Sequence, residues 1–249
     1  MKYHKNKRMC RPEEGKGVAT PLRIIPLVFE DRHGRTPRDV HISGTVIAGW
    51  TGRDVVAVEK HIVELEKLGI RRPATTPIFY RVSAARLSID NTIEALGQTS
   101  SGEVEYILLQ CSGRLWVGVG SDHTDREVEA YGITVSKQLC DKPIARTFWP
   151  FDEVAPHWSA LVLRSHLLEN GKTVCYQEGT VNSMLEPTNL IERYTNSAGF
   201  TDGTLMFCGT LEAIGGIRPS RRFAFELEDP VLGRIIRHYY DVHNLPVLG

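Results

Sequence analysis

The sequence has few cysteines: five among 249 residues, with no C-x-x-C pair. Because their number is odd and they lie far apart, the sequence predicts neither a disulfide framework nor a zinc knuckle. Cys208, in the apolar stretch LMFCGT, has the chemistry of a nucleophile. No base lies near it in the sequence, so a buried apolar thiol is the favoured interpretation.

Long apolar runs and net charge are also missing. No run approaches the roughly 20 apolar residues of a membrane-spanning helix, and the first twenty residues have no apolar core after their basic start. Thirty basic residues balance thirty acidic ones, so no strong field attracts nucleic acid or an anionic membrane. We expect a cytoplasmic protein whose partner is a small molecule or another protein, with no nucleic-acid or membrane partner.

Several functional motifs are absent as well. The chain contains neither G-x-G-x-x-G nor a P-loop, which argues against nucleotide binding. It has no G-x-S-x-G elbow, and Ser121 in GVGSDH lacks the second glycine that a serine hydrolase requires. There is no internal repeat and no alternation of strands and helices, so a doubly wound sheet or a (β/α) barrel is disfavoured.

The composition is that of a globular protein, with 41% hydrophobic residues. Residues 1–20 are polar and basic, and we expect a flexible segment there. The length of residues 21–249 suits a single domain with a sizeable core.

The first third of the chain predicts a hairpin and a helix. Residues 23–50 alternate apolar and polar residues around the turn RHGR, which is typical of a β-hairpin. Apolar residues at three- and four-residue spacing predict a helix over residues 51–69, with Thr51 as its N-cap and Gly69 as its stop. The prolines of the next segment, Pro73 and Pro77, predict loop and short strand.

The rest of the chain is mainly β in pattern. Segments of strand length and composition are VEYILLQ, RLWVGVGS, LVLRSHLLENGKTVCYQEG with a turn at Asn170-Gly171, GTLMFCGT and RRFAFELED. EPTNLIERYTNSAGF reads as the one later helix. Together these patterns predict a mixed α/β, β-rich fold of two packed sheets with peripheral helices.

Carboxylates interrupt this β pattern. Glu103 and Glu105 are two apart on a strand and therefore point to one face, and Asp122 returns to the same end if CSG is a turn. Carboxylates buried together need a counter-charge, and oxygen ligands suit Mg²⁺ or Mn²⁺ better than zinc. Taken alone, E-x-E is also the pattern of a solvated edge strand.

Five stretches occur in an order that resembles the fumarylacetoacetate hydrolase superfamily. They are EVEYILL, SDHTDREVE, KQLCDKPIARTFWPFDEV, YQEGTVNSMLEPTNLIERY and GTLMFCGTLEAIGG, and the resemblance runs from about Trp50 to beyond Gly216. SDHTDR and AGWTGRD are similar to an uncharacterised bacterial and fungal branch. The resemblance implies the fumarylacetoacetase C-terminal-like fold, packed mixed sheets of β-roll type, and a homodimer.

Carried over by position, the resemblance implies that Glu103, Glu105 and Asp122 are the metal ligands. Lys137 falls where the family has a lysine that contacts an oxyacid substrate; without the family it would be read as a surface lysine. Gly209 and Thr210 fall in the loop that holds the substrate's carboxylate or carbonyl oxygens.

The helix carries a further correspondence. His61 and Glu64 are three apart and share a helix face, which by itself is usually a solvated face. Several family members use an H-x-x-E at this place as a dyad that activates water. Arg81 occupies the position of a lysine in many relatives, which implies a positive charge near the substrate.

The resemblance implies a metal-dependent enzyme acting on a 2-oxo or 1,3-dicarbonyl acid, whose carboxylate and neighbouring carbonyl or enolate oxygen the cation chelates. Carbon–carbon hydrolysis, decarboxylation, hydration and isomerisation all remain open, as does a non-catalytic member that binds a small acid. The sequence departs from the family in the short connection between Glu105 and Asp122, in CGTLEAIGG without a proline, and in the extra acid Asp125.

Overall fold

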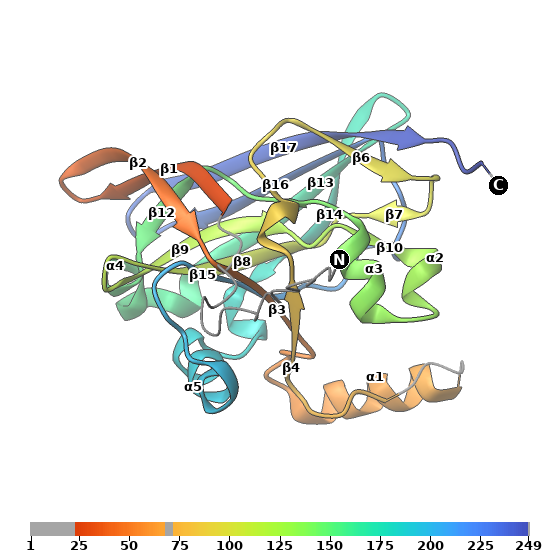
Figure 1. Ribbon diagram of the computed structural model, residues 1–249, viewed down its shortest axis with the longest axis horizontal. Coiled ribbons are helices and arrows are strands. Elements are labelled where there is room, and N and C mark those ends of the chain that lie inside the picture. The colour runs from red at the N-terminus through yellow and green to blue at the C-terminus, as the bar shows by residue number, and fades with distance from the viewer. Residues whose placement is uncertain (1–22, 68–71, 249) are drawn as a thin grey trace, which may run out of the picture.

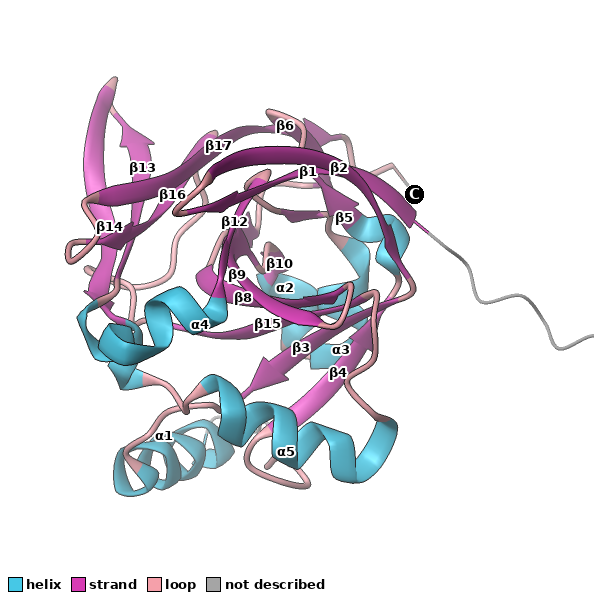
Figure 2. Ribbon diagram, turned by 90° about the vertical axis from the view of Figure 1, so that its left-hand side faces the viewer, coloured by secondary structure: helices cyan, strands magenta, loops and turns pink. Residues whose placement is uncertain are grey.

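Two curved sheets form the body of the protein (Figures 1 and 2). The computed structural model describes residues 23–67 and 72–248; the expected flexible segment 1–20 and the expected helix stop Gly69 lie outside these residues. The larger sheet has eight strands, in the order β2 (Gly34–Ile42), β1 (Arg23–Asp31), β12 (Thr147–Pro150), β9 (Arg114–Ser121), β8 (Val104–Cys111), β15 (Thr204–Thr210), β3 (Gly44–Gly49) and β4 (Ile78–Val82).

The second sheet has five strands, and two short ladders complete the β structure. The five-stranded sheet has the order β14 (Lys172–Thr180), β13 (Val162–Glu169), β16 (Arg222–Asp229), β17 (Arg234–Leu245) and β6 (Thr92–Leu96). The two ladders pair β10 (Thr124–Asp125) with β7 (Ser100–Ser101) and β11 (Lys142–Pro143) with β5 (Leu87–Ser88).

Strand β8 lies in the middle of the larger sheet and is buried on both faces. Its side chains alternate, so Tyr106 and Leu108 enter the core between the two sheets, while Ile107 and Leu109 pack into a second core with the β1–β2 hairpin. A strand covered on both faces reads as a continuous apolar run, which explains the segment YILL. The expectation of a β-rich fold with two packed sheets is confirmed.

The predicted hairpins form as expected. β1 and β2 pair antiparallel along their full length around the turn at residues 32–33. β13 and β14 pair around Asn170 and Gly171, which both have positive φ, as a two-residue hairpin turn requires. β8 and β9 form the hairpin that the turn CSG predicted.

Helices lie at the margins of the sheets (Figure 2). They are α1 (Val55–Lys67), α2 (Arg126–Glu129), α3 (Ile133–Leu139), α4 (Phe151–Val154) and α5 (Pro187–Ala198). Two of them, α1 and α5, were expected; reading α5 as the one later helix was wrong, because three short helices precede it. Helices of four to seven residues are too short to build an apolar periodicity. Within the described residues, no helix is long and apolar enough to cross a bilayer.

The expected N-cap of the first helix is also corrected. The carboxylate of Asp54, not Thr51, accepts the backbone N–H groups of Val56 and Ala57, at 2.9 and 3.1 Å. Thr51 is buried, and the backbone of neighbouring Gly52 bridges to Met184. This contact between Gly52 and Met184 keeps residues 51–52 out of the helix, which begins at Val55 directly after Asp54.

We expect Asp54→Ala to lower the free energy of unfolding by about 1 kcal/mol, because two N–H groups at the start of α1 lose their acceptor. Asp54→Asn, which keeps a capping oxygen, is the matched control and should cost only a few tenths of a kcal/mol. Urea denaturation measures both variants. Equal stability of Asp54→Ala and the parent would contradict this capping assignment.

Candidate metal centre and its cavity

Three carboxylates converge at one end of the β8–β9 hairpin. Glu103 immediately precedes β8, Glu105 is its second residue, and Asp122 directly follows β9. The N–H of Asp122 donates to the carbonyl of Glu103 at 3.0 Å, which closes this end of the hairpin. One ligand atom from each carboxylate lies within 4.8 Å of the others. The spacing of the sequence therefore does bring Glu103, Glu105 and Asp122 together.

Glu105 is buried without a basic partner at hydrogen-bond distance among the described residues. Its Oε2 accepts the backbone N–H of Gly209 at 2.7 Å. Burial raises the pKa of Glu105 well above its ordinary value, and the neighbouring charge of Asp122 adds to this effect. Glu105 is thus a carboxyl group that lacks a full counter-charge.

Asp122, in contrast, is held by two buried lysines. Lys137 of α3 pairs with its Oδ2, and the Nζ of Lys142 on β11 lies 3.1 Å from its Oδ1. Burial alone would raise the pKa of Asp122, but the two lysines outweigh it and lower the pKa to about 2. Lys142 also donates to the carbonyl of His123 at 2.5 Å, which fixes its ammonium group beneath the cluster.

Arg126 at the start of α2 neutralises the third carboxylate. Its guanidinium lies 3.1 Å from Glu103 and 2.9 Å from Glu129, and its Nε donates to Ser101 at 2.7 Å. Asp125, the extra acid of the sequence, does not join the cluster. Its carboxylate caps α2 by accepting the N–H groups of residues 127 and 128.

The cluster opens into a cavity of about 720 Å³. Glu103, Glu105 and Lys137 lie in its wall, as do Gly209 and Thr210. The other described lining residues come from β3 and the loop after it, from α1, from β4, from the α2–α3 region and, with Ile217, from the loop after β15. The expectation that Lys137 lies beside the carboxylates, and not on the surface, agrees with its exposure of 7%.

The donor set fits a hard divalent cation. All three candidate ligands offer carboxylate oxygens, which Mg²⁺ and Mn²⁺ prefer, and no described histidine or cysteine joins them. The buried carboxyl of Glu105 is the observation that matters most, because a cation there would supply its missing counter-charge. Lys137 and Lys142 already occupy both oxygens of Asp122, so Asp122 would have to share an oxygen with the cation.

Gly209 and Thr210 belong to a bulged end of β15, where the pairing with β8 shifts register. Gly209 has φ 102°, and a Cβ there would lie 1.8 Å from the Thr51 hydroxyl, so only glycine fits. Its N–H is directed to Glu105, and the hydroxyl of Thr210 donates to the carbonyl of Val104 at 2.8 Å. Both residues line the cavity, but these polar groups already have partners within the fold.

The structure does not bring Arg81 to the described cavity wall. Arg81 lies on β4 beside Tyr80, whose side chain lines the cavity, so Arg81 points to the opposite face of the strand. Its guanidinium donates to the hydroxyl of Tyr194 at 3.0 Å. His61 and Glu64 lie on α1, but their side chains fall outside what the structure describes.

The sequence reading missed Lys142 and Arg126. Both lie within quoted motifs, KQLCDKP and SDHTDREVE, so the only available signal was a basic residue in an otherwise buried segment. His123 in the second motif is buried and neutral, because burial lowers its pKa to about 3. Its two ring nitrogens contact Tyr240 and Ser100, so it is no base for the cavity.

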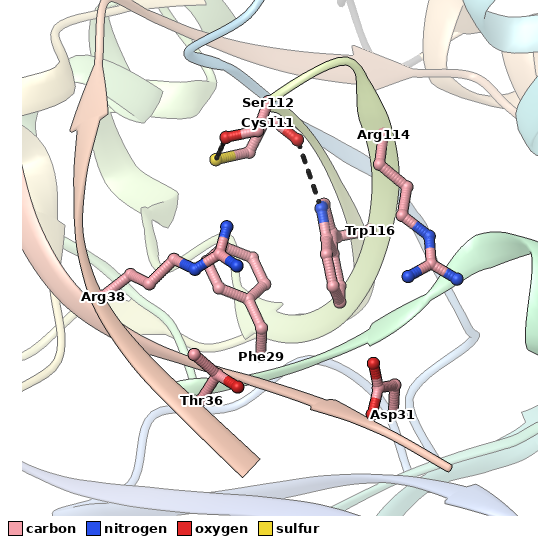
Figure 3. A pocket seen from close by; sticks show the side chains of 8 residues that line it. All are labelled: Phe29, Asp31, Thr36, Arg38, Cys111, Ser112, Arg114 and Trp116. Carbon is pink, nitrogen blue, oxygen red and sulfur yellow. Dashed lines mark hydrogen bonds between the residues drawn. The ribbon is translucent and has the colours of Figure 1, made fainter. Parts of the chain in front are cut away.

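A second, smaller cavity of about 240 Å³ lies at the opposite end of the β8–β9 hairpin (Figure 3). There the guanidinium of Arg38 lies over the ring of Phe29, and Trp116 stands beside them. Arg114 is paired with Asp152 at 2.7 Å. Because the hairpin strands are eight residues long, about 20 Å separate this pocket from the carboxylates, so it does not belong to their site.

The four described cysteines are free thiols. Cys208 is fully buried, and burial raises the pKa of its thiol well above the ordinary value. A nucleophilic cysteine needs a lowered pKa and access to substrate, so the structure supports the interpretation of Cys208 as a buried apolar residue.

Comparison with known proteins gives a family and a fold. The model of a family described as "Protein of unknown function (DUF2848)" matches residues 48–240. No curated protein matches the sequence. Among solved structures, the protein Cg1458 is similar with a TM-score of 0.60 and 13% identity, over 84% of this chain and 85% of that one.

A second solved structure is 2-keto-3-deoxy-D-arabinonate dehydratase complexed with magnesium and 2,5-dioxopentanoate. It matches with a TM-score of 0.61 and 13% identity, over 85% of this chain and 77% of that chain. At such identities the likeness shows the fold alone. It confirms the fumarylacetoacetase-like fold that the ordered motifs implied.

We expect Glu105→Gln to stabilise the metal-free protein at neutral pH. The pKa of Glu105 is raised in the folded state, so above about pH 4.5 the unfolded state loses this proton first and the parent loses stability as the pH rises. Glutamine keeps an acceptor for Gly209 and has no charge. Urea denaturation in EDTA should show a stability difference that is small near pH 4.5 and grows toward pH 8.

Proposed function

Since the chain belongs to the DUF2848 family and has a fumarylacetoacetase-like fold, we propose that it is a divalent-metal-dependent enzyme acting on a 2-oxo or 1,3-dicarbonyl acid. Glu103, Glu105 and Asp122 are the proposed ligands of Mg²⁺ or Mn²⁺. The observation that carries the proposal is the meeting of three carboxylates, one of them buried without a full counter-charge, beside a cavity that Glu103 and Glu105 line and that is large enough for a small acid.

The bound cation would supply Lewis-acid polarisation of the substrate's oxygens. Lys137 lines the cavity and holds its charge there, because Asp122, Glu103 and Glu105 raise its pKa although burial acts against it. We assign Lys137 to the anionic end of the substrate. Lys142 has a different role: it is fully buried beneath Asp122 and keeps that carboxylate ionised and in place.

Gly209 and Thr210 shape the same end of the cavity. The N–H of Gly209 orients Glu105, and Thr210 joins β15 to β8 through the carbonyl of Val104. Both lie close enough to contact a substrate held between Glu105 and Lys137. We therefore assign both residues to substrate binding through the atoms that line the cavity. Their polar groups are used within the fold, where they bond to β8, the strand that carries Glu105.

A lyase-type reaction is the form of the proposal that the neighbours support, since the magnesium-complexed neighbour is a dehydratase. Carbon–carbon hydrolysis requires in addition a base that activates water, and His61 with Glu64 on α1 is the pair we propose for it. Residues of α1 line the cavity, namely Ala57 and Val58, so the helix is suitably placed. A non-catalytic small-acid sensor would bind the same ligands without turnover.

Metal binding is tested by melting the protein with and without Mg²⁺. At a hundredfold excess over the dissociation constant, binding should add about 2.7 kcal/mol of stability, and Glu105→Ala should abolish the gain. An unchanged melting temperature of the parent in Mg²⁺ or Mn²⁺ would rule out the site.

The role of Lys137 is tested with oxalate, a small planar diacid. Lys137→Met should weaken oxalate binding at least tenfold and Mg²⁺ binding much less, because Asp122 keeps Lys142 as its partner. Titration calorimetry measures both affinities. Lys172→Met, which removes an exposed lysine of β14, is the control and should change neither. Equal losses of metal and oxalate affinity would make Lys137 a purely structural partner of Asp122.

The proposed dyad is tested by His61→Ala. If His61 activates water, the variant should keep its Mg²⁺ and oxalate affinities while turnover of an acylpyruvate falls by roughly 10² to 10⁴. Lys67→Ala on the same helix is the control for a general disturbance of α1. Full hydrolytic activity of His61→Ala would exclude the dyad as the source of the activated water.

A further inference from the structure

The charges of the large cavity gather at one end. Its charged lining residues among those described are Glu103, Glu105, Glu129, Arg126 and Lys137. All five belong to the carboxylate cluster or are paired with it. Along the rest of the described wall there is no cation that could receive a second anionic group of a ligand.

The remainder of the wall is mostly apolar. Its apolar residues come from β3, α1, β4, α3 and two loops, and they are Ile47, Trp50, Val58, Tyr80, Ile133 and Ile217. The Trp50 side chain forms a hydrogen bond with Tyr80, so these polar atoms satisfy each other. Hydroxyl groups of a ligand placed here would lose hydrogen bonds to water and find few new ones.

Tyr80 marks the border between the two regions. Its ring lies 6.0 Å from the Nζ of Lys137 on one side and joins the side chain of Trp50 on the other. A ligand whose acid head lies beside Lys137 would therefore meet Tyr80 first and Trp50 next. The head alone, with about six heavy atoms at no more than about 30 Å³ each, fills less than a third of the 720 Å³.

Two local features, a strained backbone at Trp50 and a close approach at Gly52, accompany the apolar wall. Trp50 has φ 59°, a left-handed conformation that is a strained outlier for a bulky side chain. A Cβ on Gly52 would lie 2.7 Å from a methyl group of Val58, so glycine is what lets α1 bring Val58 this close to the end of β3. Both features place apolar side chains in the wall of this cavity.

We propose that the substrate is a monoanionic 2-oxo acid with an uncharged alkyl or aryl tail, which lies against Tyr80, Trp50 and Val58. This inference rests on the proposed function, because the acid head is assigned to the metal centre. Against the described part of this wall, a distal carboxylate would be desolvated without a partner, and a polyhydroxylated chain would leave its hydroxyls unsatisfied. Apolar contact accordingly sets the specificity.

The test measures dissociation constants by titration calorimetry with the full chain in excess Mg²⁺. The probes are oxalate for the head, and 2-oxohexanoate, 2-oxoadipate and 2-oxogluconate for three tails of equal chain length. 2-Oxohexanoate should bind at least about tenfold more tightly than either polar analogue. Tighter or equal binding of 2-oxoadipate or 2-oxogluconate would overturn the inference while leaving the proposed function intact if oxalate binds. Failure of oxalate to bind would overturn both.

A pair of variants on one helix locates the tail. Val58→Asp places a carboxylate in the cavity wall and should weaken 2-oxohexanoate at least tenfold without a comparable loss for oxalate. Val55→Asp makes the same change at a position that is 73% exposed and does not line the cavity, so it should alter neither affinity. Equal effects of the two variants would contradict the placement of the tail.

Trp50→Gly separates binding from folding. Glycine adopts positive φ without strain, so the variant should melt no lower than the parent while it loses affinity for 2-oxohexanoate and keeps affinity for oxalate. A lower melting temperature with unchanged 2-oxohexanoate affinity would show that Trp50 serves the fold alone, and this result would remove it from the tail site.

Discussion

The charge balance at the end of the β8–β9 hairpin opposite its turn is the constraint on which the site depends. Asp122 is ionised inside the protein because Lys137 and Lys142 pair with its two oxygens. An unpaired buried charge would cost several kcal/mol, and the two lysines together remove this cost for Asp122. Each lysine comes from a different element, α3 and β11, which ties the α2–α3 region and the β5–β11 ladder to the centre of the large sheet.

Glu105 is the exception to this balance, because no lysine or arginine among the described residues pairs with it. This is the reason for proposing a cation beside it. Its neighbours on the same face of β8 are Ile107 and Leu109, which belong to a dry core. The N–H of Gly209 and the charge of Lys137 compensate the charge of Glu105 only in part, because burial and Asp122 raise its pKa more strongly. The proposed divalent cation would supply the missing counter-charge, and without it we expect Glu105 to make the protein less stable than a neutral side chain would.

The large cavity has a charged wall and an apolar wall because different elements of the fold form each of them. The hairpin end and α2–α3 bring the charges, whereas the end of β3, β4 and α1 bring Trp50, Tyr80 and Val58. Lys137 and Tyr80 are neighbours across this junction. A ligand that uses both walls must be polar at one end only, so the packing of the elements itself restricts the substrate.

The sequence by itself determined the two longer helices, the three hairpins and the meeting of Glu103, Glu105 and Asp122, because side-chain periodicity and short turns are local rules. Its order of motifs also indicated the fold. Only the tertiary structure decided that Asp54 caps α1, that Asp125 caps α2, that Arg81 faces Tyr194, and that Lys142 lies beneath Asp122. Some of these outcomes depend on contacts between residues far apart in the chain, and others on which of several side chains accepts the free N–H groups of a helix. The energy of such a contact exists only after burial has removed water from both partners.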